Sequence, residues 1–510
     1  MSTSVPTGEL AEFGYRQELR RTLGGFSAFA AGFSFVSILT TVFQLFGFGY
    51  SFGGTLFFWT WPVVLAGQLM VALNFAELAS RYPLAGSVYQ WARQLGGGSR
   101  GFPGWLAGWM MLLGCVVALA AAAIALQVVL PSVWRGFQLV GGDPSITSAT
   151  GATNAALLGT LLLVFTTVVN ATGVRLVARI NDVGVAAELI GVVVLIGGLA
   201  TFAVRGPQVV LHATPSASGA PSAGAGAVLA SALAAAYVLY GFDTAASVAE
   251  ETKNARRAAP RAVIRALLVS GLGGLVVVLL ALMAAPSLTD GQLAGQGLPY
   301  VITAVFGDTF GRIFLADVAV AVVVCTLTIQ TGTIRLFYSM ARDGALPFSR
   351  RLSRVNTRTG TPIAPAVVSG VLAIALLVVN LGNSTLFSTI TATSVVVVYL
   401  AYLLVTAPLL AERLRGTLPP ARPGWFSLGR WAVALNIAAV AYGLAMIVNI
   451  AWPRPEIYDL GGTGSMWMLL FPVEFVVAAL LAGFCWWLRM RRRGTQGTSA
   501  TTPVPEGALP

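Results

Sequence analysis

The sequence predicts an all-α polytopic membrane protein with about twelve transmembrane helices. Of its 510 residues, 56% are hydrophobic and 10% are charged, and the mean hydropathy is +0.80, far above that of an ordinary soluble domain. Apolar runs recur from residue 26 to residue 488 with no polar domain between them. The basic residues gather in alternate connecting segments, as they do in membrane proteins.

Each apolar run is about 20 residues long, enough for a helix to cross a bilayer core of roughly 30 Å. The runs lack the period-two alternation of a barrel strand, so helix is the expected state. We place the spans at 26–50, 55–80, 104–130, 153–173, 184–204, 226–249, 263–285, 314–334, 364–381, 387–411, 431–452 and 466–488.

The distribution of Lys and Arg predicts the orientation of the chain. With a cytoplasmic N-terminus, the outer segments contain only four of the 31 Lys and Arg residues, namely Arg135, Arg205, Arg312 and Arg454. This strong positive-inside bias predicts a multi-pass protein of the cell membrane with both termini in the cytoplasm. It also explains the net charge of +12 without binding of nucleic acid.

One transporter domain, residues 26–489, is predicted between two tails. Residues 1–25 form a cytoplasmic N-terminal tail without the pattern of a cleaved signal peptide, and residues 490–510 form a disordered cytoplasmic C-terminal tail. The linker 206–225, rich in Pro, Gly, Ala and Ser, is also expected to be unfolded. Within the domain, two repeats cover roughly 26–204 and 226–411, and extra helices follow in 431–488.

Two spanning segments contain residues that interrupt a helix in lipid. The first carries Ser34, Ser37, Thr40, Thr41, Gln44, Gly47 and Gly49, and the sixth carries Tyr240-Gly241-Phe242-Asp243-Thr244. Broken helices at the start of successive five-helix blocks indicate an inverted-repeat transporter with a midplane site, because unpaired backbone groups are tolerated only around a cavity. The alternative is that the glycines serve helix packing and the hydroxyls bond to their own helix.

Five carboxylates lie in or near the spans: Glu77, Glu188, Asp243, Asp317 and Glu474. Asp243 adjoins the sixth-segment break, so we expect it to handle a cation, an amine or a proton, with helix-end capping as the alternative. Glu77 precedes Arg81 by four residues, the spacing of a surface pair. Asp317 and Glu474 are expected near the outer interface, whereas Glu188 lies two turns into the fifth span.

Other classes of protein are disfavoured. The sole histidine, His212, lies in the linker, and no catalytic triad, metal-ligand or nucleotide motif is present, so we expect neither an enzyme nor a resident cofactor. Cys115, Cys325 and Cys485 have no metal or disulfide spacing. A channel would need polar rings along a pore, and a permease-like receptor stays open as a less favoured alternative.

Three stretches give a resemblance to a known family. They are Phe75-Ala76-Glu77-Leu78-Ala79-Ser80-Arg81-Tyr82-Pro83-Leu84-Ala85-Gly86-Ser87-Val88-Tyr89, then Gly241-Phe242-Asp243 through Glu250-Glu251-Thr252-Lys253-Asn254, and Arg335 followed by Met340-Ala341-Arg342-Asp343-Gly344-Ala345-Leu346-Pro347. Together they resemble the amino acid, polyamine and organocation transporter superfamily, most of all its amino acid/choline branch. The sequence departs from the family pattern at Asn254-Ala255, usually Asn-Pro, and at Leu39-Thr40-Thr41, where small residues are usual.

The resemblance implies a five-plus-five inverted repeat of the LeuT type, with a substrate held between broken helices 1 and 6. By position, Thr40, Thr41 and Val42 match the backbone donors for a substrate carboxylate. Tyr240, Gly241 and Phe242 match the carbonyls and aromatic lid around the amine, beside Asp243. Tyr89 matches a loop that closes the inner side.

Glu188 aligns with a position where some prokaryotic members carry a lysine that replaces a sodium ion. The hypothesis is that Glu188 either binds a cation together with hydroxyls such as Thr326 or Thr328, or titrates as the coupling proton site. The coupling ion is therefore H⁺ or Na⁺. Asp243 is a second candidate for this role.

The function predicted from these residues is secondary-active transport of amino acids or related amines such as γ-aminobutyrate, by alternating access. A choline or polyamine carrier is the alternative, because Asp243 with Phe242 and Tyr240 could form part of an aromatic cage. The expected partners are a small-molecule substrate and the lipid bilayer. The exact substrate, the choice between symport and exchange, and the oligomeric state stay open.

Overall fold

The computed structural model describes residues 10–15, 17–19, 21–95, 101–146, 148–214, 225–379, 381, 384–458 and 466–494. Within these residues the secondary structure is helical, and the β-type contact is an isolated parallel bridge between Leu23 and Thr252. The prediction of an all-α fold is therefore confirmed.

Ten further helices cross the bundle, and one of them, α12, is kinked at Gly307, where φ is 70° and ψ is 174°. They are α3 (Thr60–Arg81), α5 (Phe102–Val133), α6 (Ala149–Thr172), α7 (Val174–Thr201), α10 (Ala255–Ala284), α12 (Leu298–Arg342), α14 (Ile363–Val379), α15 (Ser384–Arg415), α16 (Ala432–Ala451) and α18 (Met466–Gly494). In the described residues, nine stretches are long and apolar enough to cross a membrane, and α8 and α14 are shorter apolar helices. One of the nine, Gly25–Arg81, contains two predicted spans, so all twelve predicted spans are found.

The first and sixth spans are interrupted, as predicted. The first consists of α1 (Gly25–Val36) and α2 (Ile38–Gly53), which are separated at Ser37, where φ is 39° and ψ is 96°. The sixth consists of α8 (Ala225–Val238) and α9 (Thr244–Ser247), with the non-helical stretch 239–243 between them.

The packing of the helices follows the two predicted repeats. The second helices of the repeats, α3 and α10, pack together, as do the third helices, α5 and α12. In addition, α5 packs against α15 and α12 packs against α7, so the third helix of each repeat contacts the fifth helix of the other. Such reciprocal contacts are expected of two structurally equivalent halves.

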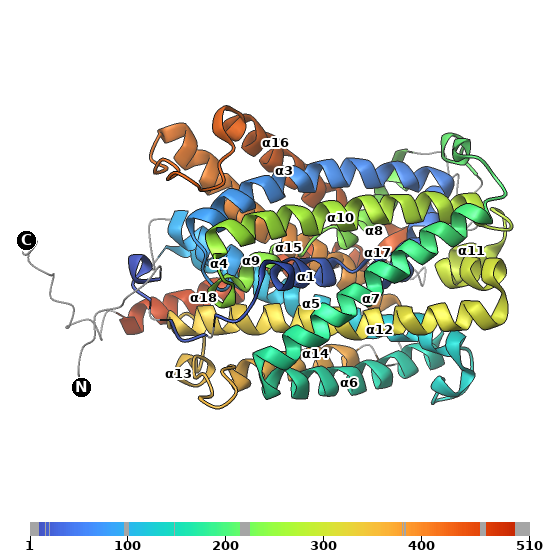
Figure 1. Cartoon of the computed structure of the whole chain (residues 1–510), viewed down its shortest axis with the longest axis horizontal. Coiled ribbons are helices and arrows are strands. Elements are labelled where there is room, and N and C mark those ends of the chain that lie inside the picture. Colours follow the sequence, from blue (N-terminus) through green and yellow to red (C-terminus); the bar gives the residue numbers. More distant parts are fainter. Residues whose placement is uncertain are drawn as a thin grey trace, which may run out of the picture.

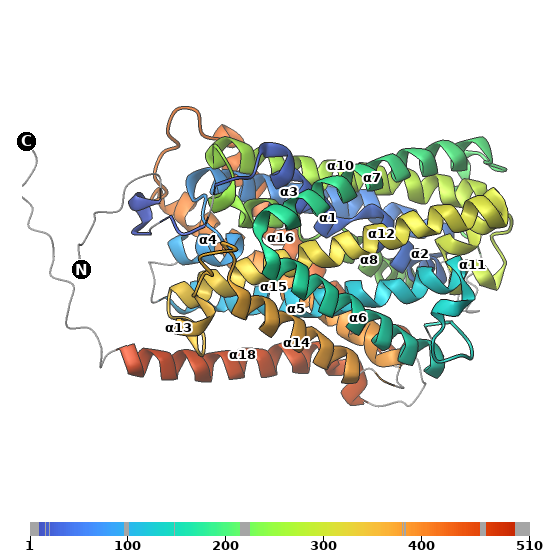
Figure 2. The same ribbon diagram turned by 60° about the horizontal axis from the view of Figure 1, so that its bottom comes forward.

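Small residues allow these close contacts. A Cβ atom added to Gly114 of α5 would lie 2.5 Å from Val398 of α15, and one added to Gly184 of α7 would lie 2.3 Å from Val324 of α12. Glycine is used at such helix crossings in membranes because backbones then approach and gain dispersion contacts. The extra helices α16 and α18 lie outside this core, and Figure 2 shows α18 along one edge of the bundle.

Short helices connect the spans at the two ends of the bundle. They are α4 (Ser87–Leu95), α11 (Gly291–Gly295), α13 (Ser349–Leu352), α17 (Pro455–Tyr458), and the 3-10 helices η1 (Ala11–Phe13), η2 (Gly54–Trp59), η3 (Arg135–Phe137), η4 (Pro207–Leu211), η5 (Ala249–Glu251) and η6 (Gly429–Trp431). The N-terminal segment consists of the described residues before α1, namely 10–15, 17–19 and 21–24. We call the end that carries α4, α13 and this segment the terminal end; α11 lies at the opposite end (Figure 1).

The predicted N-terminal tail contains a packed part, because Leu10 and Leu19 are buried. Two other sequence-based expectations were wrong. The predicted linker begins with η4, whose Val209 and Val210 are buried. Helix α18 continues to Gly494, past the predicted start of the C-terminal tail at residue 490. Residues 1–9, 215–224 and 495–510 lie outside the described part of the chain.

Candidate functional site

The break in the first span exposes the N-terminus of α2. Backbone N–H groups in the first turn of a helix have no partner within the helix. Ser37 caps them, because the Thr40 N–H donates to Ser37 Oγ at 3.3 Å. The Thr41 hydroxyl donates back to Ser37 O at 2.8 Å. This bond agrees with the alternative in which the hydroxyls of the first span bond to their own helix. The break is therefore held by its own side chains.

Glu188 of α7 reaches the same helix end. Its Oε1 accepts from the Ser37 hydroxyl at 2.9 Å and from the Leu39 N–H at 3.2 Å. Its Oε2 has no hydrogen-bond partner among the described residues, although the side chain is only 1% exposed. A carboxylate at a helix N-terminus is stabilised by the N–H groups and by the helix dipole. Glu188 thus occupies the end of α2 that points toward the break.

The break in the sixth span is held by a carboxylate and a tyrosine. Gly241 has a φ of +89°, which favours glycine, and its N–H donates to the Tyr402 hydroxyl oxygen at 2.9 Å. Tyr402 of α15 in turn donates to Asp243 Oδ1 at 2.6 Å, and Ser87 donates to Asp243 Oδ2 at 2.8 Å. Both oxygens of the buried Asp243 are therefore bonded within the protein.

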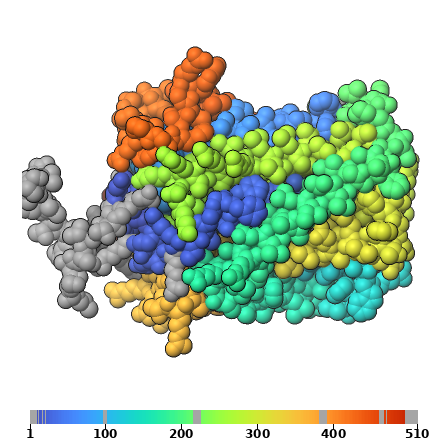
Figure 3. All heavy atoms as spheres, viewed as in Figure 1, coloured from blue at the N-terminus to red at the C-terminus, as the bar shows by residue number. Residues whose placement is uncertain are grey.

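The two breaks face each other. The rings of Phe35 and Tyr240 meet edge to face with centroids 5.9 Å apart, and a Cβ atom on Gly241 would lie 2.0 Å from the Phe35 ring. In the space-filling view α1 shows as a blue band between α10 and α7 (Figure 3), both of which it contacts. This packing joins the first and sixth spans at their interruptions.

The residues predicted to bind substrate lie around these two breaks. Thr40, Thr41 and Val42 form the first turns of α2, and Tyr240, Gly241, Phe242 and Asp243 form the stretch between α8 and α9. All seven are buried. Phe242 packs against the rings of Phe75 and Tyr402. Their contact with a substrate stays a prediction.

Thr326 and Thr328, which were proposed to bind a cation together with Glu188, do not bond to Glu188 itself, and a shared cation stays a prediction. The Thr326 hydroxyl donates to Val322 O in its own helix at 2.8 Å, and the Thr328 hydroxyl donates to Asn181 Oδ1 at 2.7 Å. A threonine in a spanning helix satisfies its hydroxyl on the nearest carbonyl when no better acceptor is in reach. The hydroxyl that reaches Glu188 is that of Ser37, from the break in the first span.

Sequence reasoning missed three residues of the site. Ser37 was noted only as one polar residue of the first span, although it is the breaking residue itself. Ser87 and Tyr402, which hold Asp243, were not singled out for this role. Ser87 carried a local signal, since it follows Gly86 directly after a Pro-containing turn. Tyr402 carried none, because its distance of 159 residues from Asp243 becomes a contact only through folding.

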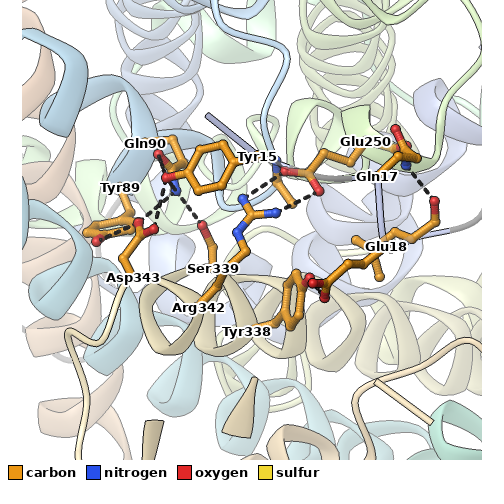
Figure 4. Close-up of polar contacts among 12 residues, drawn as sticks. Tyr15, Gln17, Glu18, Tyr89, Gln90, Glu250, Tyr338, Ser339, Arg342 and Asp343 are labelled. Carbon is orange, nitrogen blue, oxygen red and sulfur yellow. Dashed lines mark hydrogen bonds and ion pairs between the residues drawn. The ribbon is translucent and has the colours of Figure 1, made fainter. Parts of the chain in front are cut away.

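A polar cluster closes the terminal end of the bundle (Figure 4). Asp343, just after α12, accepts from the Tyr89 hydroxyl at 3.0 Å, from the Tyr15 hydroxyl at 2.9 Å and from Gln90 at 3.1 Å, and it forms an ion pair with Arg93. Burial raises the pKa of both Tyr15 and Tyr89, and Asp343 raises each further. The two phenols therefore stay protonated and act as donors. Tyr89 therefore lies in the cluster at the terminal end, and its role in closing the inner side stays a prediction.

Two buried ion pairs lie next to this cluster. Arg342 binds Glu250 with Nη2–Oε1 and Nη1–Oε2 distances of 2.9 and 3.1 Å, and its guanidinium lies 3.9 Å from the centroid of the Tyr15 ring. Arg335 binds Glu251 through two hydrogen bonds of 2.8 and 3.1 Å. Both pairs therefore connect η5, which follows the break in the sixth span, to α12, the eighth span.

The N-terminal segment lies across these groups. Glu18 accepts from the Tyr338 hydroxyl at 2.7 Å, Gln17 donates to Glu250 O at 3.0 Å, and Leu19 packs against Ala85 and Tyr338. This segment precedes α1 directly, so its contacts hold α1 against the terminal end.

A small cavity lies between α1, α7 and α12, between the first break and the terminal end. Its walls include Ser27 and Ala31 of α1, Asn181 of α7, and Thr328 and Arg335 of α12. The ion pair of Arg335 with Glu251 borders it. Opening of the terminal end would therefore expose Ala31, which is 5% exposed in this structure.

The surface interpretation of Glu77 was wrong. Its ion pair with Arg81 is present at 2.7 Å, but both side chains are buried, and Glu77 Oε2 also binds Arg413 of α15 at 2.9 Å. Arg413 further binds Asn74 and Asn436. The pairing of Glu77 with Arg81 was predicted correctly from their spacing, but their exposure to solvent was not, because α16 and the loop before it cover this helix end. Glu474 is exposed and Asp317 is partly buried.

Replacing Asp343 with alanine is expected to loosen the N-terminal segment. The change removes the acceptor of four donors, and each hydrogen bond to a charged group contributes about 1.5–3 kcal/mol. A cysteine in place of Leu19 should then react with a polar maleimide at least about tenfold faster, the equivalent of about 1.4 kcal/mol. The matched control is Asp290→Ala at the opposite end, where Asp290 accepts from Tyr300 at 2.9 Å. Equal labelling of Leu19→Cys with and without Asp343 would contradict this role.

Comparisons with known proteins agree with this architecture. The model of the amino acid permease family matches residues 23–480. The chain is 30% identical to the amino-acid permease BAT1 homolog of Oryza sativa subsp. japonica over 87% of each chain, and 28% identical to amino-acid permease BAT1 of Arabidopsis thaliana over 88% of this chain and 89% of that one. It is 25% identical to amino-acid permease 2 of Neurospora crassa over 93% and 88% of the two chains. The chain therefore belongs to the amino acid permease family, within the amino acid, polyamine and organocation transporter superfamily.

Proposed function

We propose that this protein is a secondary-active transporter of amino acids or amino-acid-like amines such as γ-aminobutyrate, and that it binds its substrate between the breaks of the first and sixth spans. The observation that carries the proposal is that both breaks exist and face each other across Phe35 and Gly241. The relatives named above are amino-acid permeases, which supports this substrate class.

The main-chain groups at the breaks suit the two charged groups of an amino acid. The N-terminus of α2 offers N–H groups and a positive dipole end for a carboxylate. The C-terminal ends of α1 and α8 offer carbonyl oxygens and a negative dipole end for an ammonium group. Phe35, Tyr240 and Phe242 border the stretch between these ends. Backbone recognition of this kind selects the amino acid class and leaves side-chain selectivity to the neighbouring residues.

Transport requires the bound substrate to reach each side in turn. In this structure the residues around the breaks are buried and the terminal end is closed by Asp343, Glu250 and Glu251 with their arginine partners. We infer that alternating access opens this end by separating η5 and the N-terminal segment from α12. We propose that the terminal end lies in the cytoplasm and the protein in the cell membrane, and the one-sided distribution of Lys and Arg supports this orientation.

Glu188 is our candidate for the coupling site. It faces Ser37 and the α2 N-terminus, Cys325 lies near it on α12, and Asp317 lies against α7 one turn away, since a Cβ atom on Gly191 would be 2.2 Å from Asp317 Oδ2. None of the ion pairs formed by the described residues includes Glu188. A buried carboxylate without a basic partner gains most from taking up a cation, either H⁺ or Na⁺.

The experiment is transport by purified protein in proteoliposomes. The wild type should accumulate an amino acid when a pH gradient or a Na⁺ gradient is imposed, and separate assays with each gradient identify the ion. Glu188→Gln should lose gradient-driven accumulation completely while it retains exchange of internal for external substrate. Accumulation by Glu188→Gln at the wild-type level would contradict the coupling role, and absence of any flux of bound amino acids in the wild type would favour a receptor.

A further inference from the structure

We propose that the Glu188 carboxylate is a built-in competitor of the substrate: in the empty transporter it occupies the place at the N-terminus of α2 that the carboxylate of an amino acid takes on binding. This inference rests on the proposed function, and it names the group that occupies the carboxylate site when no substrate is bound. It assigns to Glu188 a role in substrate affinity that is separate from ion coupling.

The donors of the α2 N-terminus are already in use. The Leu39 N–H donates to Glu188 Oε1 and the Thr40 N–H donates to Ser37 Oγ. The Thr41 N–H donates to Ser37 O. The N–H groups of Leu39, Thr40 and Thr41 therefore have partners from the chain, and a substrate carboxylate has to displace one of them.

Of these partners, Glu188 is the one that can leave. Ser37 belongs to the break itself, so its side chain stays near α2, whereas Glu188 comes from another helix on a side chain with three rotatable bonds. Its Oε2 is buried and without a hydrogen-bond partner among the described residues, so this carboxylate is held through one oxygen only. Rotation away from α2 gives up the contacts of Oε1 with Ser37 and the N-terminus of α2 and breaks no ion pair.

Electrostatic repulsion also keeps Glu188 and a substrate carboxylate from binding α2 together. Two carboxylates in contact with one helix end repel each other strongly inside a protein, because the dielectric response there is far weaker than in water. The helix N-terminus stabilises one negative charge, not two. Glu188 and the substrate carboxylate therefore exclude each other, and the affinity for the substrate is lowered by the stability of the Glu188 contact.

A filled α2 N-terminus also changes what the empty transporter can do. Unpaired N–H groups in the membrane interior are costly, so a transporter that lacked Glu188 would depend on its substrate to satisfy them. With Glu188 in place, the empty protein can change between its two states. This agrees with the expectation that Glu188→Gln retains exchange, in which the site is loaded in both directions.

The test is the affinity of purified Glu188→Gln for free amino acids. Thermal shift against the twenty proteinogenic amino acids and γ-aminobutyrate identifies binders of the wild type, and calorimetry then compares wild type and variant. We expect Glu188→Gln to bind the free amino acid about tenfold more tightly, because the neutral amide competes less well for a positive helix end. The carboxamide of the same amino acid, which has no carboxylate, should gain no affinity.

Asp317→Asn is the matched control. It removes a carboxylate from the same region, but Asp317 does not bond to α2, so its effect on affinity should stay below about threefold. Glu188→Asp provides a second variant, because its shorter side chain withdraws the carboxylate from Leu39 while the charge is kept. It should also bind the free amino acid more tightly than the wild type, by a smaller factor.

The outcomes separate this inference from the proposed function. If the wild type binds amino acids but Glu188→Gln and Glu188→Asp bind them equally well or more weakly, Glu188 contributes to binding and the competitor role is overturned. If Asp317→Asn raises the affinity as much as Glu188→Gln, the effect comes from charge in general, and the inference is overturned as well. If the wild type binds none of the amino acids, the proposed function fails first and the inference fails with it.

Discussion

Replacing Gly241 with alanine is expected to abolish transport and to destabilise the protein by several kcal/mol. The residue has a φ of +89°, a left-handed conformation that costs an L-residue roughly 1–2 kcal/mol. The new Cβ atom would also lie 2.0 Å from the Phe35 ring, and overpacking of a buried site costs about 1–3 kcal/mol. Both costs arise where the two breaks meet, so transport activity and folding stability should be lost together.

The two costs can be measured separately. Thermal unfolding of detergent-solubilised Gly241→Ala gives the total loss, and the double variant Phe35→Ala with Gly241→Ala removes the clash but keeps the backbone strain. We expect the double variant to recover part of the lost stability. Gly197→Ala in α7 is the control, because no atom lies within 4 Å of a Cβ atom there, and alanine favours a helix over glycine by about 1 kcal/mol. Wild-type transport by Gly241→Ala would contradict the close approach of the breaks.

The sequence was sufficient to predict the spans because hydropathy acts locally. A run of about 20 apolar residues is required of every spanning helix, and all twelve predicted runs are helical. The two breaks were also predictable, since Gly241 and Ser37 stand among residues that a continuous helix in lipid does not favour. These features depend on the residues themselves and on their immediate neighbours.

The partners of the site residues were not predictable in the same way. Glu188 bonds to Ser37 across 151 residues of sequence, a contact that the sequence did not indicate. Glu77 was expected at a surface, but α16 and the preceding loop bury it. A helix periodicity shows which residues share a face, but the element that covers that face is set by tertiary packing.

Replacement of Glu251, which forms a buried ion pair with Arg335, is expected to favour a state that is open at the terminal end. In the closed structure the two side chains are 1% and 7% exposed and are joined by two hydrogen bonds. Replacement of Glu251 with glutamine leaves the guanidinium buried beside a neutral group, and loss of one partner of a buried pair costs about 3–5 kcal/mol. In a state open at the terminal end, water reaches Arg335 and the cost disappears. The variant should therefore favour the open state.

The expected change in population is large enough to measure. A cost of about 3 kcal/mol shifts the equilibrium between closed and open states by more than about a hundredfold. A cysteine in place of Ala31, in a background with Cys485 replaced by serine, should react rapidly with a polar maleimide only when the terminal end opens. Arg312→Ala is the matched control, since its pair with Asp308 is 55% and 82% exposed and such surface pairs contribute about 0–1 kcal/mol.

Exchanging the two charges distinguishes the ion pair from other effects of the substitution. In the double variant Glu251→Arg with Arg335→Glu, opposite charges still meet between η5 and α12, although the hydrogen bond of Arg335 to Thr331 O is lost. Partial return of Ala31→Cys to slow labelling would show that attraction between these two helices holds the end closed. If the single variant labels as slowly as the wild type, closure depends instead on Asp343, Glu250 and the N-terminal segment. Because η5 is only three residues long and directly follows the broken sixth span, a change at that break can reach the closed end through the Glu251 contact.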